Sequence, residues 1–206
     1  MRKSLAILAL SIASVFAAQS AKADDACNTA SNLVQNCGFE SGDFTSWSGT
    51  ALTDPLGFSG VDGSDPFSGA DEAFLGNETG NDTLIQTVNT VAGTTYTISF
   101  AVHNFLGQNP DANHPADFSA AFGNNPPGFS ESNVAIGPYV VETFTGTATG
   151  STTDLTFTFE DVNAFFDLDS VSVVAVPAAT PEPSSLMLLG TGALGLLGAA
   201  RRRLKR

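Results

Sequence analysis

Lysine and arginine are missing from residues 24–200 of this 206-residue chain. Arg2, Lys3 and Lys22 precede that stretch, and the other five basic residues fall within the last six positions. All 21 Asp and Glu residues lie inside it, and the chain carries a formal net charge of −13. Nucleic acids and anionic lipids attract proteins mainly through basic side chains, so the composition excludes both as partners of the central region.

The N-terminus has the three parts of a secretory signal. Arg2 and Lys3 come before a mostly apolar stretch over residues 5–18, and Ala21-Lys22-Ala23 provides a small-x-small cleavage site. The apolar stretch is shorter than the roughly 20 residues that a membrane-spanning helix needs. We therefore predict a signal peptide over residues 1–23, which signal peptidase removes, so that the mature chain begins at Asp24.

The C-terminus combines a short apolar segment with a basic end. A helix over the apolar run would be about 22 Å long, which is short of the roughly 30 Å hydrocarbon core. The basic end would stay in the cytoplasm and leave the central domain outside. An ordinary tail anchor would have the same topology. In chain order the parts are a linker (177–185) that contains Pro181, Glu182 and Pro183, the predicted transmembrane segment (186–200), and a tail (201–206) that contains Arg201, Arg202 and Arg203.

These C-terminal residues closely resemble the PEP-CTERM sorting signal of Gram-negative bacteria. In that signal Pro-Glu-Pro precedes a short span rich in Gly, Ala and Leu, which an arginine cluster follows, and all three parts occur over residues 180–206. The resemblance implies recognition by an exosortase, transient anchoring in the inner membrane, and export to the cell surface or extracellular matrix. Proteins with this signal tend to accompany exopolysaccharide and biofilm production.

Cysteine occurs only twice, as Cys27 and Cys37. In an exported chain a disulfide is the usual state of such a pair. The spacing matches no metal-binding or redox motif. We predict a structural disulfide that adds roughly 2–4 kcal/mol to the stability of the domain.

Helical periodicity is absent before residue 185, and apolar residues instead alternate with polar ones. Thr95–His103 is the clearest case, with Tyr96 and Ile98 on one face and threonines on the other. Short strands of this kind, separated by loops rich in Gly, Pro, Asn and Asp, are typical of sandwiches. We predict an all-β domain over residues 24–176, an antiparallel β-sandwich of the jelly-roll type with about eight strands. The predicted strands are 72–75, 83–88, 95–103, 118–122, 139–145, 155–160 and 165–176.

Three short motifs are spread over this domain. Residues 32–40 read Asn-Leu-Val-Gln-Asn-Cys-Gly-Phe-Glu, residues 67–75 read Phe-Ser-Gly-Ala-Asp-Glu-Ala-Phe-Leu, and residues 166–173 read Phe-Asp-Leu-Asp-Ser-Val-Ser-Val. Together they resemble the galactose-binding-like jelly rolls that include many carbohydrate-binding modules. The chain departs from that pattern at Cys37, where the family has Gly, and at Ser170, where it has Asp or Asn. The resemblance implies the same sandwich and a polysaccharide ligand.

The resemblance also implies a structural calcium ion. In the family the Glu of the first motif and the Asp of the last strand often hold this ion, and the matching residues are Glu40 and Asp169. We expect Asp169 to share the inward face of its strand with Val171 and Val173, where its charge needs a partner that no Lys or Arg supplies. The alternative is that both carboxylates cap turns by accepting backbone N–H groups.

Aromatic residues are mostly phenylalanine, with 16 Phe against one Trp and two Tyr. Such a composition indicates a packed core, and we predict that Trp47 and Tyr96 belong to it. Sugar binding needs aromatic side chains near the surface, because the C–H faces of pyranose rings pack on them. The residues near strand ends or in loops that are predicted to line a ligand cleft are His103, Phe105, Tyr139 and Phe129.

Recognisable catalytic motifs are missing. His103 and His114 could form an acid–base or metal site with Asp111 or Asp117, but they lack metal-binding spacing, and we expect exposed loop histidines. Adjacent acids resemble the carboxylate pairs of glycosidases, although a domain so rich in acids contains such pairs by chance. The sequence thus predicts a non-enzymatic surface or matrix protein with a polysaccharide ligand. The alternatives are a purely structural matrix protein and a hydrolase on the same sandwich.

Overall fold

The computed structural model of the chain describes residues 27, 29–53, 56–77, 80–105, 110–111, 114–123, 126–162 and 164–177. The predicted signal peptide, sorting motif, transmembrane segment and basic tail lie outside the described residues. Within those residues no helix has the length and apolar character needed to cross a membrane.

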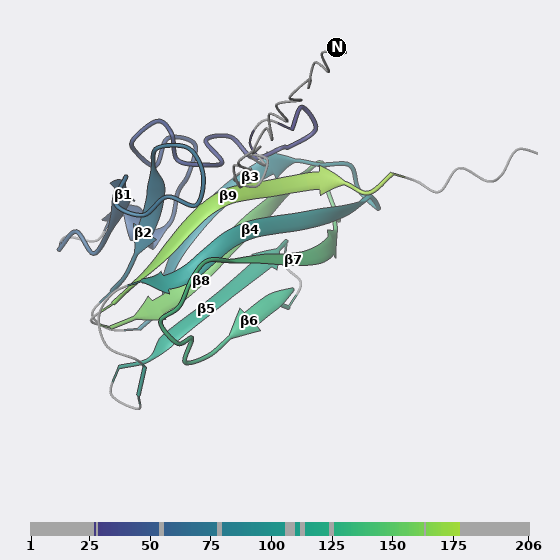
Figure 1. Cartoon of the computed structure of the whole chain (residues 1–206). Helices are drawn as coiled ribbons and strands as arrows, with labels where there is room; N and C mark the ends of the chain where they lie inside the picture. The colour runs from purple at the N-terminus through teal and green to yellow at the C-terminus, as the bar shows by residue number, and fades with distance from the viewer. Residues whose placement is uncertain are drawn as a thin grey trace, which may run out of the picture.

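The described strands form two antiparallel sheets that pack face to face (Figure 1). One sheet has five strands in the order β1-β2-β9-β4-β7, and the other has four in the order β3-β8-β5-β6. The sandwich predicted from the sequence is therefore confirmed. The elements are a short 3-10 helix η2 (Thr50–Thr53) and the strands β1 (Ser59–Asp62), β2 (Glu72–Leu75), β3 (Asp82–Asn89), β4 (Thr95–Phe105), β5 (Ala116–Phe122), β6 (Phe129–Glu131), β7 (Val140–Thr147), β8 (Thr152–Asp161) and β9 (Phe165–Ala175).

Alternate apolar residues of the two sheets meet in the core. Phe100 of β4 packs against two aromatic rings of the opposite sheet, at 5.9 Å from Phe118 and 5.1 Å from Phe157 between ring centroids. Trp47 and Tyr96 are buried, as the sequence predicted. The polar residues that alternate with these apolar ones point away from the core, which explains why the strands are rich in Thr and Ser.

A bulge in β9 corrects the expected placement of Asp169. Val173 pairs with Ile98 and Asp169 pairs with Ala101, and the register of the two strands shifts between these pairs. Ile98 and Ala101 are three residues apart on β4, so they point to opposite faces. The extra residue is Ser170, whose φ of 52° lies in the left-handed region. Asp169 therefore lies on the outer face of the five-stranded sheet, and the expectation that it shares a face with Val173 is wrong.

Two strands fall where the sequence indicated loops or strand ends. β1 and β6 fall outside the strands predicted from the sequence. β1 has four residues and β6 has three, and each forms by pairing with a longer neighbour, β2 or β5. Such short strands have too little alternation to be read from the sequence.

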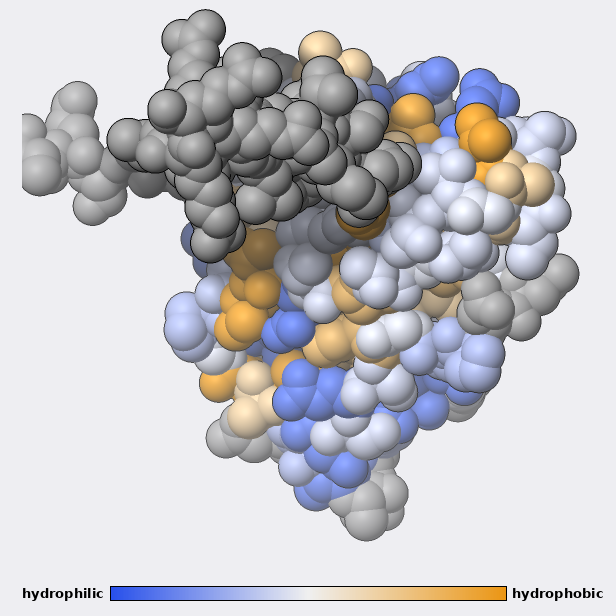
Figure 2. Space-filling view, turned by 90° about the vertical axis from the view of Figure 1, so that its right-hand side faces the viewer, coloured by the Kyte–Doolittle hydropathy of each residue, from blue (hydrophilic) through white to orange (hydrophobic). Residues whose placement is uncertain are grey.

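The outer surface carries no broad apolar face in the view of Figure 2. Apolar residues of the described part occur there in small separate areas among polar ones. The exposed large apolar side chains come from several different loops and strands, as is normal for a soluble surface. They are Leu52, Leu56, Val91, Ile136, Val140, Val141 and Val176.

Candidate functional site

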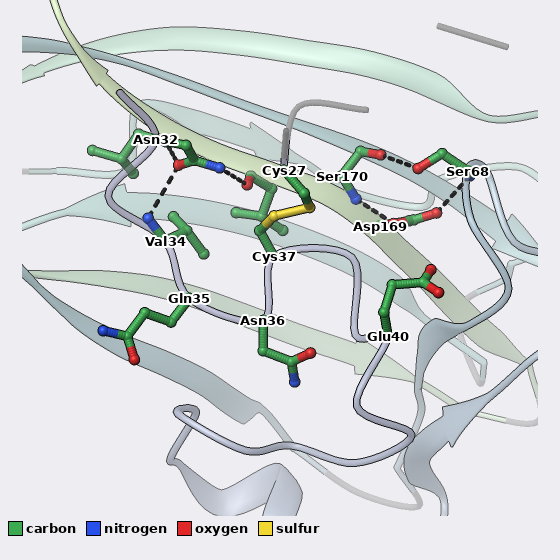
Figure 3. The surroundings of a disulfide bond; sticks show 12 residues. Cys27, Asn32, Val34, Gln35, Asn36, Cys37, Glu40, Ser68, Asp169 and Ser170 are labelled. Atoms are coloured by element: carbon green, nitrogen blue, oxygen red, sulfur yellow. Dashed lines mark hydrogen bonds between the residues drawn. A yellow bond between two sulfur atoms is a disulfide. The ribbon is translucent and has the colours of Figure 1, made fainter. Parts of the chain in front are cut away.

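The chain segment that leads to Glu40 runs along β9 (Figure 3). The amide of Leu33 donates to the carbonyl of Val173 at 3.0 Å, and the amide of Val171 donates to the carbonyl of Cys37 at 2.9 Å. The segment thus occupies the edge of β9 that β2 does not cover, since β2 pairs with residues 166–168. The N-terminal motif and the last strand, which are far apart in sequence, are neighbours in space.

Asn32 and a disulfide hold this segment in place. The Asn32 side chain donates to the carbonyl of Val171 and accepts from the amide of Val173, both at 3.0 Å. A disulfide joins Cys27 to Cys37, with 5.5 Å between their Cα atoms. The Asn32 amide group thus makes two hydrogen bonds to the backbone of β9 that a neighbouring strand would otherwise make.

Asp169 is fully buried beneath this segment. Its Oδ2 accepts the amide of Ser68 at 2.7 Å, and its Oδ1 accepts the amide of Ser170. The hydroxyls of Ser68 and Ser170 are also hydrogen-bonded, at 2.7 Å. A Cβ atom on Gly38 would lie 3.3 Å from the carboxylate, so the small residue at this position allows the segment to approach. Figure 3 shows Asp169 between the disulfide and the loop that carries Ser68.

Glu40 holds the same loop from the solvent side. Its carboxylate accepts the amide of Ala70 at 2.9 and 3.1 Å, and that of Asp71 at 3.3 Å. Gly69, between Ser68 and Ala70, has a φ of +70°, and a Cβ atom there would overlap with the Glu40 carboxylate. The structure thus brings the two predicted calcium ligands to one loop, residues 68–71.

The turn-capping alternative describes the contacts of both carboxylates, because both accept backbone N–H groups. Among the described residues, no three His, Cys, Asp or Glu side chains are arranged to hold one metal ion. A calcium ion at Glu40 and Asp169 would therefore depend on backbone carbonyl oxygens for its other ligands. Calcium binding stays a prediction.

The outer face of the same sheet carries a second group of predicted residues. His103 of β4 is buried, and its ring stacks on Tyr139 with 3.9 Å between centroids and lies 5.3 Å from Phe105. Its Nδ1 lies 2.9 Å from the carbonyl oxygen of Gly137, and its Nε2 lies 3.1 Å from Oδ2 of Asp167. Three of the four residues predicted to line a ligand cleft are thus neighbours, whereas Phe129 lies in β6 of the other sheet. The expectation of an exposed His103 is wrong.

The contacts of His103 favour a charged imidazolium. The Gly137 carbonyl only accepts, so Nδ1 carries a proton, and a proton on Nε2 then satisfies Asp167 as well. Burial lowers the pKa of His103, but the hydrogen bonds to Asp167 and Gly137 outweigh this effect and raise it. Burial also raises the pKa of Asp167, against the lowering effect of His103. His103 is therefore the cationic partner of a buried carboxyl in a domain without Lys or Arg.

Glu72 of β2 is another fully buried carboxyl on this face. Its Oε1 accepts the amides of Ser64 and Asp65, at 3.0 and 2.9 Å, and the Ser64 hydroxyl at 3.1 Å. Its Oε2 has no donor among the described groups. Burial raises the pKa of Glu72 to about 7, and a hydrogen bond with the Asp62 carboxyl contributes to the same shift. A protonated Glu72 can donate to the Asp62 carboxylate.

A pocket of about 180 Å³ opens on this face beside His103. It lies over neighbouring strands, because Asp167 pairs with both Phe74 and His103, and Phe165 pairs with Phe105. Half-buried aromatic rings and acidic or hydroxyl groups face one another in it, a combination that suits a ligand with both apolar and hydroxyl surface. The lining residues are Asp62, Ser64, Phe74, Phe105, Phe165 and Asp167.

Sequence reasoning named only Phe105 among these lining residues. Phe74 lies in β2, and Phe165 and Asp167 lie two residues apart in β9. Both strands were predicted. The missing information was the register between strands, which sets Phe74 opposite Asp167. The strand pattern alone gives the face of each residue but not its neighbour across the sheet.

The second histidine does not join this group. His114 is paired with Asp111 in a tight turn, with 3.0 Å between Nδ1 and Oδ1. Asp117 instead accepts the amide of Asn133 at 2.9 Å. The acid–base or metal site considered for His103 and His114 together is thus not formed in the described residues.

The fold and one terminal motif have counterparts among known proteins. Residues 179–203 match the family model described as the PEP-CTERM protein-sorting motif. This motif indicates export and sorting to the cell surface or beyond it in Gram-negative bacteria. The sequence prediction of a PEP-CTERM signal is confirmed. No curated protein matches the chain.

Solved carbohydrate-binding modules have the same jelly-roll fold. TmCBM61, solved in complex with β-1,4-galactotriose, is 17% identical with a TM-score of 0.52, over 70% of this chain and 99% of that one. The CBM22-1 xylan-binding domain of Xyn10C from Paenibacillus barcinonensis is 20% identical with a TM-score of 0.51, over 69% and 93%. The CBM22-1 and GH10 modules of Xyn10B from Clostridium thermocellum, solved with xylohexaose, are 15% identical with a TM-score of 0.52, over 74% and 30%. The domain therefore has the sandwich fold of carbohydrate-binding modules.

The buried carboxyls predict a stability that falls as the pH rises. Burial raises the pKa values of Glu72 and Asp161 to about 7, above their ordinary values of 4.5 and 3.8. Their stabilising contribution is complete below the ordinary values and is lost as the pH rises through about 7. We expect the melting temperature to fall by on the order of 5–10 °C between pH 5 and pH 8. Thermal denaturation at a series of pH values measures the change in melting temperature. Glu72→Gln should make the melting temperature depend less on pH, and the control Glu131→Gln, at an exposed site, should not. A stability that rises over this range would contradict the assignment.

Proposed function

We propose that this protein is an exported, non-catalytic module of the cell surface or extracellular matrix that binds polysaccharide. The observation that carries the proposal is the pocket of aromatic and acidic side chains on the outer face of the five-stranded sheet. The sorting motif supports the location, and the sandwich fold supports the class of module. Signal peptidase and an exosortase are the processing partners that this location requires, and exopolysaccharide or biofilm polymer is the material around the exported domain.

The pocket complements a sugar ring in two ways. Phe74, Phe105 and Phe165 offer apolar surface for the C–H faces of a pyranose. The exposed Asp62 offers carboxylate oxygens that accept hydrogen bonds from sugar hydroxyls, while Asp167 is buried in the pocket lining. His103 and Tyr139 pack behind these groups and hold them in position.

The absence of Lys and Arg from the domain favours polysaccharides without a dense negative charge as its ligands. Residues 24–200 contain no Lys or Arg that would pair with uronate, sulfate or phosphate groups. The solved neighbours with galactotriose, xylan and xylohexaose in their descriptions are consistent with neutral polymers. We therefore expect weak or no binding to polyuronates.

The buried state of the acids supports a binding role over hydrolysis. A glycosidase needs two carboxyl groups that flank a glycosidic bond within reach of the substrate. Glu72 and Asp167 are almost fully buried, and both are occupied with protein groups. Retention of polysaccharide without release of sugars distinguishes the binding module from a hydrolase, and a matrix function without sugar affinity would identify a structural protein.

Removal of one aromatic ring tests the sugar pocket. Phe105→Ala should weaken binding at least tenfold, or about 1.4 kcal/mol, because the ring supplies part of the apolar platform. Affinity electrophoresis and pull-down on xylan, β-1,4-galactan and the host's own exopolysaccharide measure the effect. Ile85→Ala, on the outer face of the other sheet, is the matched control and should bind as the wild type does. A wild-type protein that is retained by none of these polymers would rule out the proposed function.

We also propose that Glu40 and Asp169 hold a structural calcium ion. They converge on the 68–71 loop, no Lys or Arg neutralises them, and carboxylate oxygen is the ligand that calcium prefers. A bound ion would supply the positive charge that this part of the chain lacks. Glu40 is exposed and can reorient, whereas Asp169 is fixed by the bulge.

Thermal denaturation with and without EDTA tests this ion. Saturating calcium should stabilise the domain by about 2.7 kcal/mol at 100 times its dissociation constant, which is several degrees in melting temperature. Asp169→Ala should abolish the response, and Glu40→Gln, at an exposed site that the fold tolerates, should weaken it strongly. Glu160→Gln on the other sheet is the control. An unchanged melting temperature on addition of EDTA or calcium would contradict calcium binding. It would favour the alternative, in which both carboxylates cap turns by accepting backbone N–H groups.

A further inference from the structure

A second cavity lies between the two sheets, on the side where β6 and β7 form the edges. Its volume is about 340 Å³, and it shares no lining residue with the pocket on the outer face. Most of its wall is apolar, and Phe129, Phe166 and Val140 are part of it. A cavity of about 150 Å³ holds one benzene ring, so this one has room for a ring and a short chain.

One wall residue has an unused hydrogen-bond acceptor. Asn104 is 0% exposed, and its Nδ2 donates to the carbonyl of Val134 at 2.8 Å. Its Oδ1 has no donor among the described groups. Exchanging the two amide atoms would place an oxygen against the Val134 carbonyl, so the hydrogen-bond pattern fixes this orientation. A buried acceptor without a donor costs free energy, and a ligand with an N–H or O–H group would supply the donor.

Two acidic residues of the wall select the charge of that ligand. Glu142 lies opposite Phe100 of β4, on the inner side of β7, and Glu131 ends β6. No Lys or Arg exists between residues 24 and 200 to pair with them, and His103, which also lines this cavity, has Asp167 as its acidic partner. A cation near these carboxylates and the aromatic rings would be favoured, and a polyhydroxylated sugar would leave its hydroxyls unpaired against the apolar wall.

We propose that this cavity binds a small organic amine, in which a compact apolar body fills the space between the sheets and a protonated primary amine donates to Asn104 Oδ1. Glu142 and Glu131 provide the countercharge. The site is separate from the polysaccharide pocket, so it adds a small-molecule ligand to the domain and does not depend on the function proposed above.

Calorimetric titration of the exported protein, purified after expression of the full chain, tests the proposal with a matched pair of probes. 2-Phenylethylammonium should bind, and the neutral 2-phenylethanol, which has the same ring and chain, should bind at least tenfold more weakly. Glu142→Gln should remove most of this difference. Phe105→Ala, in the other pocket, should leave amine binding unchanged.

Two substitutions at neighbouring positions locate the site. Val140 and Val141 are both 52% exposed, but Val140 lines the cavity and Val141 lies opposite Ala101 on the outer face. Val140→Trp should block amine binding, and Val141→Trp should not. Equal affinity for the amine and the alcohol, binding that survives Val140→Trp, no binding at millimolar concentration, or a crystal structure with only an ordered water at Asn104 would each overturn the proposal. Because Glu142→Gln changes one atom at a half-buried site, the charge test remains valid if Val140→Trp does not fold.

Discussion

Buried carboxyl groups that have no Lys or Arg to pair with are the constraint on which the rest of this structure depends. Among the residues that the structure describes, four acids are at most 2% exposed: Glu72, Asp161, Asp167 and Asp169. Backbone amides hold Asp169 and Glu72, a histidine holds Asp167, and burial keeps Asp161 protonated up to about pH 7. For Glu72 and Asp169, backbone amides of the loop between β1 and β2 supply the donors in place of an ion pair.

The position of the loops on the outer face follows from this constraint. Glu72 accepts the amides of residues 64 and 65, Asp169 accepts the amide of residue 68, and Glu40 accepts those of residues 70 and 71. The loop between β1 and β2 is thereby attached to the sheet over β9 and leaves the pocket with Phe74 and Phe105 open beside it. The lack of Lys and Arg that leaves these carboxyls without ion pairs also gives the domain its excess of acidic charge. Structure and ligand preference therefore have one physical origin.

Most strands could be predicted from the sequence because each carries its own alternation, as Thr95–His103 shows, whereas β1 and β6 could not. Asp169 could not be placed, because the bulge at Ser170 reverses the faces and depends on contacts with Ser68 and the N-terminal segment. His103 was expected in an exposed loop, and it is buried because Tyr139, in the segment just before β7, stacks on it. The residues of the two cavities meet through strand register and sheet packing, which no local pattern encodes.

Amide hydrogen exchange measured by NMR tests the central claim most directly. The amides of Ser64, Asp65 and Ser68 lie in no strand, yet each donates to a buried carboxylate. These three amides are predicted to exchange as slowly as amides within the central strands β4 and β9. Exchange at the rate of exposed loop amides would show that the carboxylates do not hold the loop, and it would contradict this account of the fold.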